Sequence, residues 1–153
     1  ADEIGFAIAQ SLVLEIGGEP VGVREDARTL YHAALAHGSN HLVTVVNDAL
    51  DALRTALADT ELTGQQPVES RPGGVAERVL APLLSAALDN VLRSGPAALT
   101  GPVARGDADT VDAHLRALTA LDDDLAEGYR ALSLRSAQRT GATHIVDRLR
   151  RQS

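Results

Sequence analysis

Four polar residues on one long helical stretch have the types and spacing to line a site. Tyr31 and His32 are followed by Ser39 and Asn40. Seven residues span about two helical turns, so Ser39 falls almost directly below His32 on the same face. The stretch is apolar on most of its sides, and polar groups in such surroundings pair with one another or line a pocket. The pattern therefore predicts either a hydrogen-bonded core network or the wall of a site.

A fifth polar residue lies within an apolar stripe farther along the chain. Asn90 follows Leu83 by seven residues, which again is about two helical turns. A buried amide needs hydrogen-bond partners. Asn90 is therefore expected either to bond to a helix end or loop, or to face the same cavity as Asn40.

The third candidate is a run of ten residues, 98–107, which holds two glycines, one proline and an arginine. Its last residue, Asp107, is expected to cap the helix that follows, which would place Arg105 at that helix's positive end. Together with the hydroxyl of Thr100, Arg105 then suits a carboxylate or phosphate. The alternative is an ordinary turn in which Arg105 pairs with an internal carboxylate such as Asp89 or Asp109.

Composition excludes several other kinds of chemistry. The chain has no Cys, so it has no disulfide, thiolate metal site or cysteine nucleophile, and all 14 basic residues are Arg, so it has no Schiff-base or P-loop lysine. His37 and His41 are four residues apart, but no acidic residue follows at a zinc-like spacing, so no metal site is expected. The sequence also lacks the glycine-rich G-x-G-x-x-G turn, the Walker loop, G-x-S-x-G and H-E-x-x-H.

The charge and hydropathy of the chain limit the kinds of partner that are expected. The net charge is -7 over 153 residues, which argues against a nucleic-acid partner. No apolar stretch reaches the roughly 20 residues that span a bilayer, and no signal peptide is evident. We therefore expect a soluble, cytoplasmic protein with no membrane segment.

The elements that must position these residues are all helices. Ala and Leu dominate, and β-branched or aromatic runs are few, which favours an all-α fold. The stretch 25–57 is apolar on more than one side, so we expect a helical bundle with one long central helix, in a single domain over residues 1–153. A loop is expected over 60–74, and Pro82 should kink or split its helix. The expected helices cover 2–16, 25–57, 75–94, 108–121, a segment beginning at 122–124, and 144–149.

Taken together, these motifs resemble a family of two-domain, NAD(P)-dependent oxidoreductase-like proteins whose substrates are unassigned. The resemblance spans about 16–129, and the Ala/Leu-rich, lysine-free composition is similar to that of actinobacterial versions. The residues that carry it are Tyr31-His32, Ser39-Asn40, Asn90, the run Leu99-Thr100-Gly101-Pro102-Val103-Ala104-Arg105-Gly106-Asp107, and His114.

The resemblance implies a fold and an arrangement of domains. In this family a Rossmann-like N-terminal domain holds the dinucleotide, and the C-terminal half is a helical domain of unknown function. That half is similar to the C-terminal domains of 6-phosphogluconate dehydrogenase, ketopantoate reductase and pyrroline-5-carboxylate reductase. The chain is thus expected to be the C-terminal part of a longer protein, with no NAD(P) site of its own.

The resemblance also implies roles for the candidate residues in a cleft for a small carbonyl or imine substrate. The reductase relatives carry a catalytic lysine on the first long helix, and this chain has none. His32 is therefore expected to donate the proton, and Asn40 or Asn90 to orient the substrate. The residues expected to bind substrate are Tyr31, Ser39, Asn90, Thr100, Arg105 and Asp107.

A homodimer is expected because a 153-residue bundle has trouble covering so many apolar faces. The alternatives are a stand-alone helical interaction module and a non-catalytic domain that senses a metabolite. A compact monomer with a buried central helix remains the alternative to the dimer.

Overall fold

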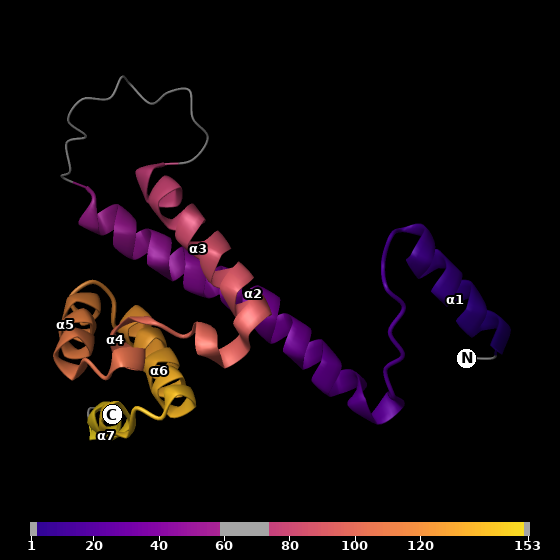
Figure 1. Cartoon of the computed structure of the whole chain (residues 1–153). Coiled ribbons are helices and arrows are strands. Elements are labelled where there is room, and N and C mark those ends of the chain that lie inside the picture. Colours follow the sequence, from indigo (N-terminus) through magenta and orange to yellow (C-terminus); the bar gives the residue numbers. More distant parts are fainter. Residues whose placement is uncertain (1–2, 59–73, 152–153) are drawn as a thin grey trace. The chain divides into compact units, whose positions relative to one another are not determined.

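The computed structural model describes residues 3–58 and 74–151, and within them every regular element is helical (Figure 1). The all-α prediction is confirmed, and the predicted helix bounds agree closely with those observed. Short 3₁₀ turns cover Glu25–Ala27 and Gly95–Ala98. The helices are α1 (Glu3–Glu15), α2 (Arg28–Ala56), α3 (Val75–Ser94), α4 (Gly101–Arg105), α5 (Ala108–Thr119), α6 (Asp123–Thr140) and α7 (Thr143–Arg151).

Two breaks between or within helices were expected, one at Pro82 and one over 60–74. Pro82 lies inside α3, and the helix continues through it from Val75 to Ser94, so the split does not occur, and the alternative of a kink stays a prediction. The expected loop over 60–74 falls, except for Gly74, outside the described residues. No described helix is long and apolar enough to cross a membrane.

The chain divides into two compact units. The N-terminal unit is Ala1–Val45 and the C-terminal unit is Val46–Ser153, so the boundary falls within α2. Neither α1 nor α2 contains a buried residue. The long helix is present as predicted, but the expectation that it forms the centre of the core is wrong for the described residues.

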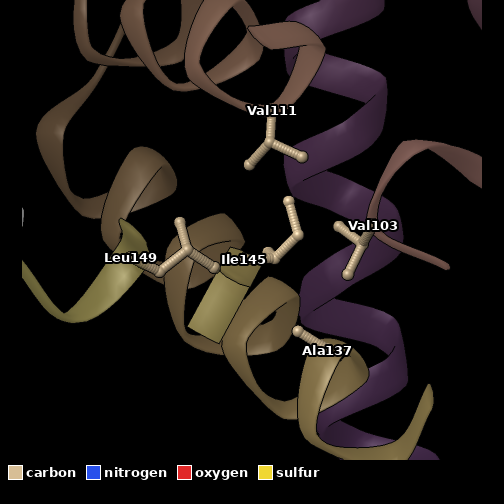
Figure 2. Close-up of a cluster of buried hydrophobic side chains, with 5 residues drawn as sticks. All are labelled: Val103, Val111, Ala137, Ile145 and Leu149. Carbon is tan, nitrogen blue, oxygen red and sulfur yellow. The ribbon is translucent and has the colours of Figure 1, made fainter. Parts of the chain in front are cut away.

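The core instead lies among the last four helices of the C-terminal unit. Helix α5 packs on α6, α6 packs on α7, and α4 contacts both α5 and α6. Figure 2 shows the buried side chains gathered around one point. They are Val103, Val111, Ala137, Ile145 and Leu149.

The ends of these helices are fixed by residues whose types match their positions. Asp107 and Asp122 cap α5 and α6 by accepting a hydrogen bond from a backbone N–H three residues on. Gly106 and Gly141 follow α4 and α6 with φ of 75° and 74°, a conformation that glycine adopts without steric cost. These stops hold α4 to α7 as short helices that fold back on one another.

Candidate functional site

The candidate residues of the N-terminal unit all lie on α2. Tyr31, His32, Ser39 and Asn40 are all exposed, and the Ser39 Oγ donates a hydrogen bond of 2.7 Å to the carbonyl oxygen of Leu35. The same hydroxyl lies 3.3 Å from the Asn40 Oδ1. The expected buried network is therefore wrong, because the polar atoms are exposed. A role in ligand binding stays a prediction.

Asn90 is also exposed rather than buried. It lies on α3, where the Arg93 Nη2 is 3.4 Å from its Oδ1. Arg93 also forms an ion pair of 2.6 Å with Asp89, one turn away. Asp89 is therefore engaged on α3 itself, which removes it as the expected structural partner of Arg105.

The run expected to be a turn contains the short helix α4. Thr100 precedes α4 and makes no capping hydrogen bond with its side chain, while Arg105 is the last residue of the helix. A cation is favoured at a helix C-terminus, so the position of Arg105 agrees with the dipole of α4. The side chain of Arg105 is exposed and forms no ion pair with another described residue.

Asp107 caps α5 as predicted, and both carboxylate oxygens take part. The Thr110 backbone N–H donates to Oδ1 at 3.1 Å, and the Thr110 hydroxyl donates to Oδ2 at 2.7 Å. These two bonds lower the pKa of Asp107 below its usual 3.8, and the charges of Arg105 and His114 lower it further. Arg105 and His114 therefore both lie close enough to Asp107 to affect its carboxylate.

A polar pair that the sequence analysis did not assign joins α5 to α6. The His114 Nδ1 lies 2.9 Å from the Tyr129 hydroxyl, and the two rings meet edge to face. Burial raises the pKa of the Tyr129 phenol, and the nearby hydroxyl of the buried Ser133 opposes that rise.

Sequence spacing contained part of the signal for this pair. His114 follows Asp107 by seven residues, which places both on the same face of α5. The sequence around Tyr129 gives no sign of which residue its hydroxyl meets. Only the packing of α6 on α5 brings that hydroxyl to the imidazole.

Two other contacts in the described residues involve histidines. The His144 Nε2 donates to the Gly106 carbonyl oxygen at 2.7 Å, which ties α7 to the junction between α4 and α5. On α2, the Nδ1 atoms of His37 and His41 are 2.7 Å apart. The described residues contain no group of three His, Cys, Asp or Glu side chains suited to a metal ion.

A groove of about 660 Å³ in the C-terminal unit is lined mainly by residues of α5 and α6, and His114 is not among them. Its walls include Asp112, Arg116 and Glu127, and none of the residues predicted from the sequence to form a site lines it. Asp112 is buried and accepts a hydrogen bond of 2.8 Å from the Arg148 Nε. Arg148 on α7 thus holds the Asp112 carboxylate in place, so this residue of the groove wall has a structural role.

Comparison with known families assigns the chain. Residues 1–136 match the family described as Domain of unknown function (DUF2520). The chain belongs to this DUF2520 family. No curated protein and no solved structure matches it. The DUF2520 match includes every candidate residue and the pair His114–Tyr129, but it ends before Ala137, Ile145 and Leu149, which complete the core.

Proposed function

We propose that this DUF2520 chain is a helical dimerisation domain that forms one wall of the substrate cleft of a cytoplasmic NAD(P)-dependent oxidoreductase, with a small carbonyl or imine substrate. The fold similarity to the C-terminal domain of 6-phosphogluconate dehydrogenase belongs to the same proposal. It rests on the family resemblance carried by motifs such as Thr100–Asp107, which all lie within the matched range. The dimer is the part that the geometry of the chain supports directly.

The observation that carries the dimer is the apolar surface of the N-terminal unit. Large apolar side chains on α1 and on the first half of α2 are exposed, among them Ile4 at 72%, Leu12 at 57% and Leu35 at 53%. Soluble monomers rarely expose contiguous apolar patches larger than a few hundred Å². A face of this kind is stable in water when a second apolar surface covers it.

The number of exposed apolar side chains also favours a dimer. Apart from Tyr31, eleven large apolar residues between Ile4 and Val45 are exposed. An interface of standard size buries about 800 Å² per partner, so a stable dimer would have to cover many of these side chains. A second copy of the chain supplies the same apolar surface, so an isologous pairing covers both faces at once.

The chain itself does not fit a dinucleotide. A pyrophosphate is held by a glycine-rich turn between a strand and a helix, whereas the described residues form no strand and the sequence has no G-x-G-x-x-G. NAD(P) is therefore assigned to a Rossmann-like partner domain. The residues proposed to face that domain's substrate from α2 are Tyr31, His32, Ser39 and Asn40.

Sedimentation equilibrium on the chain tests the dimer. The expected mass is twice 16.0 kDa. Leu35→Glu, which adds a charge to the apolar face while keeping a good helix former, should give a monomer. The matched control is Leu132→Glu on α6, where the side chain is exposed to a similar degree and lies outside the N-terminal unit. A monomeric wild type, or equal dissociation by both variants, would contradict the proposal.

Calorimetric titration with NADPH tests the assignment of NAD(P) binding to a separate domain. No binding to this chain is expected at micromolar concentrations, because it supplies no pyrophosphate cradle. Micromolar affinity of the chain alone would overturn the two-domain assignment and leave the dimer untouched. The two parts of the proposal therefore fail separately.

A further inference from the structure

We infer that His37 and His41 on α2 form a bidentate site for a divalent transition-metal ion that prefers bond angles near 90°, such as Cu²⁺ or Ni²⁺. The sequence predicted no metal here, because no acidic residue follows at a zinc-like spacing. Spacing along the chain does not show how closely two rings approach, and the structure adds that observation. The inference goes beyond the proposed function and requires neither the dimer nor a substrate.

The close approach of the two rings carries the inference. His37 and His41 are four residues apart, so they are neighbours on one face of α2. Their Nδ1 atoms are 2.7 Å apart and their ring centroids 4.9 Å apart, so the two nitrogens face each other. Two imidazole nitrogens at this distance share a cation, which is a proton or a metal ion. When a metal ion takes the place of the shared proton, that proton moves to the Nε2 of its own ring.

The distance between the nitrogens also favours one kind of metal. Imidazole nitrogens lie about 2.0–2.1 Å from ions of this class, so a 90° bond angle separates two ligand nitrogens by about 2.9 Å and a tetrahedral angle by about 3.3 Å. The observed 2.7 Å is closer to the first value. Both side chains are exposed, so a small rotation of each ring directs both lone pairs to one ion. Square-planar and tetragonal geometry is typical of Cu²⁺ and Ni²⁺, whereas Zn²⁺ favours the tetrahedron.

The surroundings of the pair suit a nitrogen-bound metal better than a hard cation. The sequence has no charged residue over 29–47, so no neighbouring carboxylate on this part of α2 offers the oxygen ligands that Mg²⁺ and Ca²⁺ require. Ala34 and Gly38 lie three residues before His37 and His41, and a Cβ at Gly38 would meet nothing within 4 Å. These small residues leave room for the water molecules that complete the coordination of the ion.

The other three histidines of the chain differ from this pair. His114 faces the Tyr129 hydroxyl, and His144 bonds to the Gly106 carbonyl oxygen. His32 lies on α2 and is exposed, but alanine and arginine occupy the positions four residues after and before it. His32 is therefore the matched control for a single exposed imidazole on the same helix.

Calorimetric titration of the full 153-residue chain with Ni²⁺ tests the site. One ion per chain should bind, and His37→Asn and His41→Asn should each weaken binding by at least about tenfold. The double variant should bind no more weakly than either single variant, because a chelate is lost with either ligand. His32→Asn should bind as the wild type does, and circular dichroism confirms that the variants are folded. Additive losses in the double variant, or an equal loss in His32→Asn, would overturn the inference.

The choice of metal is tested by its geometry and by comparison with zinc. Electron paramagnetic resonance of the chain with one equivalent of Cu²⁺ should show a tetragonal ion coupled to two nitrogens in the wild type and to one in His41→Asn. Ni²⁺ should bind more tightly than Zn²⁺, because the ring positions are closer to a 90° angle. Tighter binding of Zn²⁺, or a Cu²⁺ spectrum that is the same in both chains, would contradict the assignment.

One further variant separates the metal site from the proposed dimer. His37 follows Leu35 by two residues, which is about 200° around the helix, so the pair lies on the side of α2 away from Leu35. Leu35→Glu should therefore keep the Ni²⁺ affinity of the wild type, whether or not it becomes monomeric. A loss of Ni²⁺ binding in Leu35→Glu would show that the two histidines of one chain are not sufficient and would refute the site as inferred.

Discussion

The N-terminal and C-terminal units place apolar residues at the same helical spacing and bury them to opposite extents. In α1, Ile8 and Leu12 are four residues apart and are 56% and 57% exposed. In α7, Ile145 and Leu149 have the same spacing and are 1% and 0% exposed. The difference lies outside each helix, because α7 packs on α6 and α5, whereas α1 buries no residue.

This contrast separates what a periodic pattern specifies from what it leaves open. A spacing of three to four residues fixes the face of a helix that is apolar. It does not specify the surface that covers this face. In the C-terminal unit the covering surface comes from neighbouring helices of the same chain, and for the N-terminal unit we propose that it comes from a second copy.

The largest expected effect is the loss of a core leucine. Leu149→Ala leaves a cavity among α5, α6 and α7 and should lower the free energy of unfolding by about 2–5 kcal/mol. Urea denaturation followed by circular dichroism measures this change. Leu12→Ala is the matched variant in α1, and below the concentration at which the chain dimerises it should change the free energy by no more than about 0.5 kcal/mol.

The stability losses of these two variants should depend differently on protein concentration. Where dimers form, Leu12→Ala should lose stability because association stabilises the folded state by mass action. The cost of Leu149→Ala should be the same at both concentrations, since its contacts are internal to one unit. If Leu12→Ala were as costly as Leu149→Ala at low concentration, α1 would be packed within the monomer and the contrast would fail.

The sequence predicted most of the helices because their signals are local. Gly17, Gly95 and Gly141 follow helices with positive φ, and Asp107 and Asp122 begin helices as caps. The core was misplaced because the long apolar stripe of α2 was equated with burial. Burial depends on contacts between helices far apart in sequence, which a single sequence does not display.

The candidate site was predicted less well for the same reason. Asp107 was correctly identified as a cap, because capping depends on residues three apart. The expected burial of His32 and Asn90 was wrong, since it required knowing which faces of α2 and α3 are covered. The contact between His114 and Tyr129 joins residues fifteen apart on two helices, so it emerged only from the packing of α5 on α6.

Three glycines of nearly equal φ give a graded comparison of the two units. A Cβ at Gly106 would lie 2.6 Å from the His144 Cε1, so Gly106→Ala should displace that ring in addition to straining the backbone, at a cost of about 2–3 kcal/mol. Gly141→Ala meets nothing within 4 Å and should cost only the backbone strain, about 1–2 kcal/mol.

Gly17 completes the series in the N-terminal unit. It has φ of 76° and open space around it, so the local strain of Gly17→Ala equals that of Gly141→Ala. Because Gly17 follows α1, which buries no residue, fraying of that helix end should relieve the strain without unfolding the core. Thermal unfolding of the three variants should rank Gly106→Ala lowest and Gly17→Ala close to the wild type. A Gly17→Ala variant as unstable as Gly141→Ala would show that α1 is coupled to the core.

The smallest expected effect is a change in stability at low pH, and it tests the Asp107 cap at the start of α5. The pKa of Asp107 is lowered in the folded state, so its contribution to stability is complete above the usual value of 3.8 and is lost as the pH falls through the lower folded pKa. Asn also caps helices but carries no charge. Asp107→Asn should therefore reduce the acid limb, which is the loss of stability as the pH falls, while keeping most of the stability near neutral pH.

Glu77 and Glu127, whose pKa values are also lowered in the folded state, should still lose their contributions at low pH, so part of the acid limb should remain. Asp109→Asn, an exposed change in the first turn of the same helix, is the control for the loss of one negative charge there. Urea midpoints measured between about pH 2 and 6 distinguish the variants, since protonation linkage acts over that range for carboxylates. An unchanged acid limb in Asp107→Asn would show that the carboxylate contributes to α5 only as a neutral hydrogen-bond acceptor does.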